Sequence, residues 1–323
     1  MKTTHPTLTR RAAIAGALML VAAHAAAQVS TPVRLIVGYA AGGPVDTTAR
    51  LFAPVFAREL GTQVIVENRP GASGNVAGAS VAKSAPDGLT LFFAASPTIT
   101  ISPNIYKKMP FDPATELTPV APLVSYANVL VVNKDLPFKN VADLLAYAEA
   151  NPGKLGYGSA GTGASNHLSG ELMAAQSQTQ LMHVPYKGNA PAMTDVIGGQ
   201  IGMMFDIVST ARSYVASGRV RALAVTSRER NPSLPDVPTM REAGLPNFEV
   251  VGWFGLYAPP KLPPALAARY AEAARKALAS DDLKVLWNEH GYDRWPGSAE
   301  TMATQASRER AMWGTVTKGI NVE

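Results

Sequence analysis

The sequence predicts an α/β protein with two domains, mostly parallel sheets flanked by helices, and a hinge between the domains. Its 323 residues exceed the roughly 100–200 residues of one typical domain. Short apolar runs alternate with segments of helical periodicity, a pattern typical of parallel strands joined by helices. The 47% hydrophobic share is ordinary for a globular protein and argues against long disorder or a polytopic membrane protein.

The first elements follow a strand–turn–helix order. A glycine-rich turn at Gly42-Gly43 leads into a helix with one apolar face, and Gly61 is a plausible stop signal. Pro54 lies inside that helix, where proline is expected to cause a kink or leave a carbonyl unpaired. A further helix and a turn at 86–88 separate the later strands. The strands of this part are predicted at 33–37, 63–67 and 89–95.

A second alternating series starts near residue 129. An Asn-Pro-Gly stop at 151–153 ends its first helix. Strands are predicted at 129–132, 155–158, 181–185, 201–205 and 221–226. Helices are predicted at 141–150, from about Ser165, at 191–197 and near 211–216.

The C-terminal part begins with a return crossing. The apolar segment 250–257 leads into Ala258-Pro259-Pro260, which suggests a connection between the two domains. Flexible crossings are therefore expected near 123–128 and 250–256. Helices follow at 264–279, 282–290 and 298–317.

The N-terminus has the pattern of an export signal. Lys2, Arg10 and Arg11 precede an apolar run at 12–23 and small residues at 25–27. Cleavage near Ala27 would remove these three cations and reduce the net charge from +5 to +2. The remaining chain has no basic run, so a nucleic-acid partner is not predicted. The sequence leaves Sec and twin-arginine export both open.

The inventory of reactive side chains is small. Cysteine is absent, which excludes disulfides, thiol nucleophiles and zinc–thiolate sites. The three histidines after the signal, His167, His183 and His290, have no metal-ligand spacing. No nucleophile elbow and no phosphate-binding Walker motif occurs. We therefore predict no metal, no cofactor and no catalytic residues.

One stretch matches a dinucleotide fingerprint. Residues 156–161 read Gly-Tyr-Gly-Ser-Ala-Gly between a predicted strand and a helix. A dinucleotide site also needs an acidic residue about 20 positions later, at the end of the next strand. That strand ends in 183–187, His-Val-Pro-Tyr-Lys, without a carboxylate. Dinucleotide binding is therefore disfavoured.

The glycine-rich turns are still suited to hold an anion. The turns at 39–46 and 158–165 each lead into a helix whose first N–H groups lack partners. Residues 71–75 form a similar turn. Such turns can also serve only as tight connections. Turns of this kind in both domains favour a shared cleft that accepts a carboxylate.

Several motifs in order resemble one family. They are Ala-Gly-Gly-Pro-Val-Asp at 41–46, Glu-Asn-Arg-Pro-Gly-Ala at 67–72, Ala-Pro-Asp-Gly at 85–88, Val-Pro-Tyr-Lys-Gly at 184–188, Gly-Gly-Gln at 198–200 and Asp-Val-Pro-Thr at 236–239. Together they resemble the Bug, or TctC-like, family (UPF0065) of periplasmic solute-binding proteins of tripartite tricarboxylate transporters. The resemblance covers essentially the whole chain after the signal.

The resemblance implies a two-domain Venus-flytrap protein that binds small carboxylates through two facing loops. Domain 1 would comprise 28–124 and 255–323, and domain 2 would comprise 125–254. The implied ligand site consists of Tyr39, Gly42, Gly43, Asp46, Ser96, Ser159, Gly161, Thr162, Gly163, Ala164, Ser165, His167, Tyr186 and Asp206.

Other roles are open for some of these side chains. Asp46 could cap the first helix, His167 could pack behind the site, and the tyrosines could be core residues. Lys187, beside Tyr186, could be an ordinary surface charge. Where the family often has Pro-Phe, this chain has Gly38-Tyr39, and Ala164 replaces a frequent serine. Gly202 stands at a frequently acidic position.

The predicted function is binding without chemistry. The protein would be a periplasmic monomer that captures a dicarboxylate, amino acid or aromatic acid and delivers it to a membrane permease or a sensor kinase. The alternative is an exported enzyme that uses the 156–167 loop. It would be a dinucleotide-dependent oxidoreductase or a serine hydrolase with Ser159 or Ser165 and His167.

Overall fold

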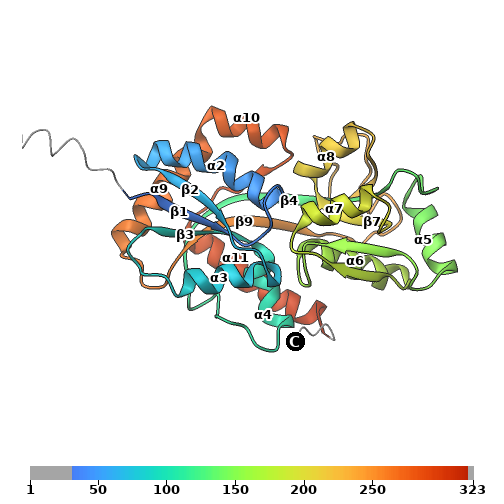
Figure 1. The fold of residues 1–323 in the computed structure, drawn as a ribbon, viewed down its shortest axis with the longest axis horizontal. Helices are drawn as coiled ribbons and strands as arrows, with labels where there is room; N and C mark the ends of the chain where they lie inside the picture. The colour runs from blue at the N-terminus through green and yellow to red at the C-terminus, as the bar shows by residue number, and fades with distance from the viewer. Residues whose placement is uncertain (1–30, 319–323) are drawn as a thin grey trace, which may run out of the picture.

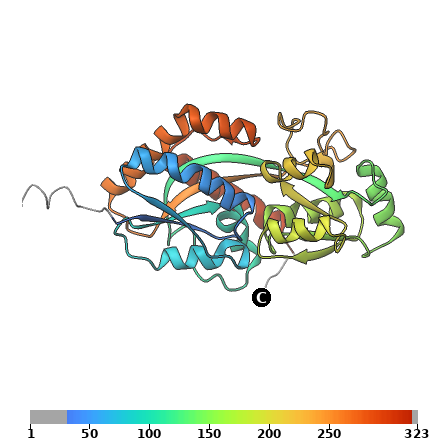
Figure 2. The ribbon, with the colours of Figure 1, turned by 45° about the horizontal axis from the view of Figure 1, so that its top comes forward.

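The computed structural model describes residues 31–318 and places them in two lobes that share one ten-stranded sheet (Figures 1 and 2). The predicted signal segment, 1–27, lies outside the described residues. The strands run in the order β2-β1-β3-β9-β4-β7-β5-β6, and β8 and β10 both pair with β4. The α/β class predicted from the sequence is confirmed.

The first lobe contains the N-terminal strands and the C-terminal helices. Strand β1 is parallel to both β2 and β3. Helix α2 starts with Pro44, keeps Pro54 inside it, and ends at Gly61 in the left-handed conformation, as the glycine predicts. The elements of this lobe are β1 (Val33–Val37), α2 (Pro44–Leu60), β2 (Val64–Asn68), the 3₁₀ turn Ala72–Gly74, α3 (Asn75–Ala82), β3 (Thr90–Ala95), the π-helical segment Pro97–Ile101, α4 (Ser102–Ile105), α9 (Pro264–Ala279), α10 (Asp281–Glu289), β10 (Asp293–Arg294) and α11 (Ala299–Val316).

The second lobe repeats the alternation of strand and helix. Strand β5 is parallel to both β6 and β7. The side chain of Asn140 caps α5 by accepting a hydrogen bond from the N–H of Asp143. The elements of this lobe are α5 (Val141–Ala150), β5 (Gly156–Ser159), α6 (Ser165–Ser177), β6 (Met182–Pro185), α7 (Asn189–Ile197), β7 (Met203–Ile207), α8 (Val208–Ala216) and β8 (Val220–Val225).

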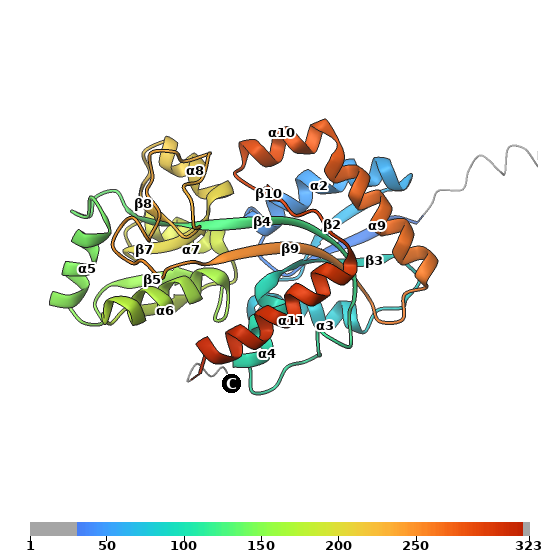
Figure 3. The ribbon, with the colours of Figure 1, turned by 180° about the vertical axis from the view of Figure 1, so that it is seen from behind.

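Two long strands, β4 (Thr118–Asn133) and β9 (Val251–Ala258), connect the lobes. The first part of β4 pairs with β9, and its last residues pair with β7 and β8. Seen from behind, both strands run along the back of the molecule from one lobe toward the other (Figure 3). The crossings expected as flexible segments are therefore paired strands.

The sheet is parallel toward its ends and antiparallel at its centre. The parallel pairs between the named strands lie among β1–β3 and β5–β7, as the strand–helix alternation predicts. The antiparallel pairs involve β4 or β9, because these strands cross between the lobes in opposite directions. The expectation of mostly parallel sheets therefore holds within each lobe but not at the crossing.

Helices cover both faces of the sheet and create separate apolar cores. In the first lobe α2 and α9 bury one face, where the rings of Phe52 and Phe56 stack with centroids 4.9 Å apart. Helices α3 and α11 cover the other face. No helix in residues 31–318 is long and apolar enough to cross a membrane.

Candidate functional site

A small cavity lies between the two lobes, where the carboxyl ends of strands from both meet. Its volume is about 10 Å³, about the space that one water molecule needs. No charged side chain lines it. The first lobe contributes Tyr39, Val45, Ala95 and Pro97, the crossing strand β4 contributes Tyr126, and the second lobe contributes Ala160, Ala164, Ser165, Asn166, Asn189 and Ile207.

Several helices begin at this cavity. The lining residues Val45, Ser165 and Asn189 lie in the first turns of α2, α6 and α7, and Ile207 directly precedes α8. First-turn N–H groups have no partners within their own helix. In the part of the chain that the structure describes, no outside acceptor contacts the N–H of Val45, Ser165 or Asn166. The cavity therefore combines free donors with converging positive helix ends.

Asp46 holds the first predicted clamp, the Gly42-Gly43 turn. Gly42 has φ +78°, and its N–H donates to Asp46 Oδ2 at 2.9 Å. Burial alone would raise the pKa of Asp46, but hydrogen bonds from Arg50, Gly42 and Asn68 outweigh burial and lower it. The carboxylate of Asp46 is thus engaged by the protein and stabilises the shape of the turn.

The second predicted clamp, residues 159–165, has its glycine amides bonded to side chains of its own lobe. Gly161 and Gly163 have φ +126° and +84°, which favour glycine. The N–H of Gly161 donates to Ser159 Oγ at 3.1 Å, and the N–H of Gly163 donates to His167 Nδ1 at 3.0 Å. Asn166 Oδ1 accepts from the N–H of Ala160 at 3.0 Å. Ser165 and Asn166 at the start of α6 line the cavity, and their amides have no acceptor among the described residues.

Asp206 lies behind the cavity and positions Asn189. Its carboxylate accepts hydrogen bonds from Asn189 Nδ2, Thr210 Oγ1 and the N–H of Ile207. Burial raises the pKa of Asp206 to about 6, although these hydrogen bonds act to lower it. Asn189 in turn lines the cavity. Asp206 therefore borders the cavity through another residue.

A larger, open pocket of about 580 Å³ lies at the outer edge of the cleft. Across it the lobes touch directly, since Ser73 Oγ donates to the carbonyl of Thr162 at 2.6 Å. The N–H of Ala40 donates to the carbonyl of Lys187 at 3.2 Å. Tyr186 lines this pocket, but its hydroxyl donates to Asp195 at 2.6 Å. These contacts hold the lobes in a closed arrangement.

Gly163 touches the opposite lobe, so its substitution should affect closure. A Cβ at Gly163 would lie 2.3 Å from Ile105 Cδ1. We expect Gly163→Ala to lower the free energy of unfolding by about 2 kcal/mol, from the positive φ and this clash. Gly153→Ala is the matched control, because its φ is +71° and nothing lies within 4 Å of its Cβ. Equal losses in urea denaturation would show that the contact with Ile105 contributes nothing.

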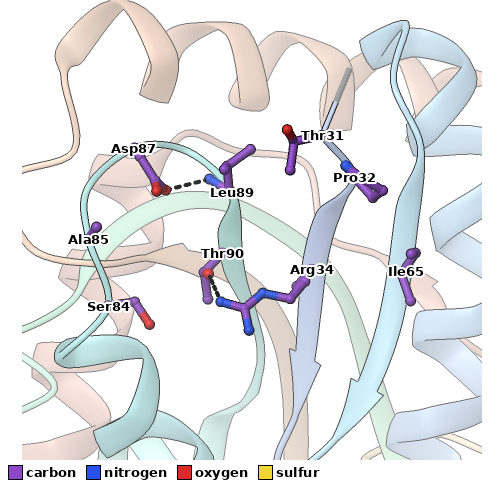
Figure 4. A pocket seen from close by; sticks show the side chains of 9 residues that line it. All are labelled: Thr31, Pro32, Arg34, Ile65, Ser84, Ala85, Asp87, Leu89 and Thr90. Carbon is purple, nitrogen blue, oxygen red and sulfur yellow. Dashed lines mark hydrogen bonds between the residues drawn. The ribbon is translucent and has the colours of Figure 1, made fainter. Parts of the chain in front are cut away.

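A further pocket of about 420 Å³ lies elsewhere on the first lobe (Figure 4). Arg34 donates to Thr90 Oγ1 at 2.8 Å there, and Asp87 accepts from the N–H of Leu89. These residues lie at the amino ends of β1 and β3, opposite the ends that form the cleft. This pocket shares no residue with the interlobe cavity.

The structure brings the predicted site residues to one region but in three layers. Tyr39, Ala164 and Ser165 line the cavity, and Ser96 lies between two residues that do. Gly161, Thr162 and Tyr186 line the outer pocket. Behind them or within the clamps lie Gly42, Gly43, Asp46, Ser159, Gly163, His167 and Asp206.

Sequence reasoning missed part of the cavity wall. Asn189 could have been found, because it follows Gly188 and precedes Pro191 at a helix start. Tyr126 gave no signal, since it lies in the crossing strand rather than at a strand end. In the sequence His183 stands alone, sixteen residues after His167, so its contact with the second clamp has no local signal. Within residues 31–318, no group of three histidines or carboxylates could hold a metal ion.

Comparison with known proteins gives consistent matches. The family model "Tripartite tricarboxylate transporter family receptor" matches residues 48–322. A UPF0065 protein from the tcbD–tcbE intergenic region of Pseudomonas sp. strain P51 is 37% identical, over 88% of this chain and 84% of the relative. The structure of the periplasmic binding protein BugD superposes with a TM-score of 0.87 at 32% identity, covering 90% of this chain and 98% of BugD.

Two similar solved structures contain a bound acid. MatC from Rhodopseudomonas palustris, with malate, has a TM-score of 0.85 and 32% identity, covering 88% of this chain and 98% of MatC. An R. palustris protein with adipate has a TM-score of 0.86 and 35% identity, covering 89% of this chain and 97% of that protein.

Proposed function

The chain belongs to the tripartite tricarboxylate transporter receptor family, and we propose that it captures a small carboxylate between its lobes and delivers it to a membrane permease or a sensor. Its family and structural neighbours are solute-binding proteins, which are not enzymes. Because BugD is a periplasmic binding protein, a periplasmic location is implied for this chain too. We also propose that the chain is exported and that its signal is cleaved near Ala27.

The observation that carries the proposal is the convergence of free main-chain donors on one uncharged cavity. Val45 from the first lobe and Ser165 and Asn166 from the second line the same space, and their N–H groups have no hydrogen-bond acceptor among the described residues. Main-chain donors at helix starts can bind an anion even where the site has no positively charged side chain. An acid that bridges the donors of both lobes would bind the closed arrangement more tightly than the open one, and would therefore stabilise the closed arrangement.

Binding requires the lobes to move apart, since about 10 Å³ cannot hold a carboxylic acid. We propose that the rotation occurs where β4 and β9 pass between the lobes. The domains would then be 28–124 with 255–323, and 125–254. The contacts of Ser73 with Thr162 and of Ala40 with Lys187 would break on opening.

Malate and adipate are the first acids to test, since similar proteins contain them. We expect at least one acid of a panel to raise the unfolding temperature, because a ligand at 100 times its Kd stabilises by about 2.7 kcal/mol. Dimethyl adipate is the matched control, since it keeps the chain length but lacks charge. If neither these nor amino and aromatic acids stabilise the protein at millimolar concentration, the proposal is wrong.

The buried hydroxyl of Ser159 gives no support to a hydrolase. Ser159 is fully buried, and its Oγ contacts His183 rather than His167. Recovery of the bound acid unchanged after denaturation would distinguish binding from turnover. The monomeric state and the identity of the permease or sensor remain parts of the proposal.

A further inference from the structure

A cluster of aromatic and imidazole rings lies directly behind the second clamp. The rings of His167 and His183 have centroids 4.1 Å apart, and the ring of Tyr157 lies 5.0 Å from that of His183. His167 is on α6 and His183 is on β6, so residues distant in sequence meet here. His167 is 4% exposed and lines neither pocket of the cleft. The geometry therefore disfavours a direct contact between the His167 ring and a bound acid.

Each histidine is linked to one glycine amide of the clamp. His167 Nδ1 accepts the N–H of Gly163 at 3.0 Å. His183 Nε2 lies 2.6 Å from Ser159 Oγ, which accepts the N–H of Gly161 at 3.1 Å. The two imidazoles thus anchor both glycines of the turn, whose φ values are +126° and +84°.

The surroundings keep both rings neutral at pH 7. Burial lowers the pKa of His167 to about 4, and burial together with the neighbouring His167 lowers the pKa of His183 to about 4. Glu171, whose Oε1 lies 3.6 Å from His167 Nε2, opposes this for His183 but does not outweigh it. Tyr157 donates to the same oxygen of Glu171 at 2.6 Å. Since Nδ1 of His167 accepts, its proton is on Nε2 and faces Glu171.

We propose that His167 and His183 are positioning residues, which hold the Gly161 and Gly163 amides in place so that the start of α6 presents its free amides to a carboxylate. This role rests on the proposed function. Without the two anchors the glycine turn would have to be ordered when the acid binds, and that cost would weaken affinity. The anchors act through the turn and do not touch the acid.

His167 makes its contact through Nδ1 and His183 through Nε2. The same two substitutions are therefore expected to have opposite effects at the two positions. In His167→Asn the side-chain oxygen can occupy the place of Nδ1, while His167→Gln reaches the place of Nε2. For His183 the order is reversed, because Nε2 makes the contact. We expect His167→Asn and His183→Gln to bind the malate or adipate probe nearly as well as the parent. His167→Gln and His183→Asn should bind it about tenfold more weakly, the effect of one lost hydrogen bond.

Amide hydrogen exchange gives a second readout that needs no ligand. In nuclear magnetic resonance spectra, Gly163 should lose protection in His167→Gln but not in His167→Asn. Gly161 should lose it in His183→Asn but not in His183→Gln. If each pair of variants behaves alike in exchange, the positioning role is wrong even where an acid binds. A crossed exchange pattern with no binding of any acid would instead support the anchors and refute the proposed function.

Discussion

Replacement of Phe254 by alanine is expected to lower the free energy of unfolding by about 3–5 kcal/mol, the range for a buried phenylalanine. Phe254 is fully buried in β9. Its ring packs against Phe93 and Tyr126, with centroids 5.4 and 4.6 Å away, and against Tyr292 at 6.1 Å. Because these partners come from β3, β4 and the segment after α10, little can move in to fill the cavity. Equilibrium denaturation in urea measures the loss.

Val251 in the same strand is the matched control. It is 44% exposed, so Val251→Ala should cost less than about 1 kcal/mol. Since Tyr126 lines the interlobe cavity, Phe254→Ala should also weaken binding of any acid that stabilises the parent. Similar losses for both variants would show that the ring cluster is not a centre of stability.

Acidification from pH 7 to about 4.5 is expected to destabilise the protein by about 2 kcal/mol. Burial lowers the pKa of His167 and of His183 from 6.5 to about 4. Their contribution is complete above pH 6.5 and is lost as the pH falls toward 4, because the unfolded chain takes up these protons first. Over this interval the loss is about 2.5 kcal/mol for His167 and about half that for the partly exposed His183.

Asp206 acts in the opposite direction. Burial raises its pKa from 3.8 to about 6, so the folded protein takes up this proton first and regains about 2 kcal/mol over the same interval. The double variant His167→Asn with His183→Gln should therefore lose less stability on acidification than the parent does. Urea midpoints at several pH values measure both. Parallel pH profiles would contradict the assignment of buried neutral histidines.

The sequence located most elements because local signals agree with the fold. The helix at 141–150 and the helix at 264–279 were predicted with the bounds that the structure gives. The crossing strand β4 was predicted only at 129–132, because Pro119 and Pro122 argue against a strand. In the structure the pairing with β9 shifts register beside both prolines, at the kind of irregularity where a strand tolerates proline.

Site residues were predictable where they directly follow a strand in the sequence. They were not predictable where their role depends on tertiary contacts. Tyr39 and Ser165 lie in glycine-rich turns after strands, a local pattern. The pairing of Gly163 with His167 and of Ser159 with His183 needs the rotation of α6 and the register of β5 with β6. Periodicity fixes neither, so the anchoring of the glycine amides could not be predicted from the sequence.

The crossing of β4 and β9 between the lobes also has a consequence for the order of folding. The sheet of the first lobe needs β9 beside β3, although residues 96–250 separate them in the sequence. A nascent chain that ends before Val251 therefore lacks the central strand and the helices α9 and α11 that cover that sheet. Contacts of such high sequence separation slow folding. The N-terminal half must wait for the C-terminal part before it can acquire its native core.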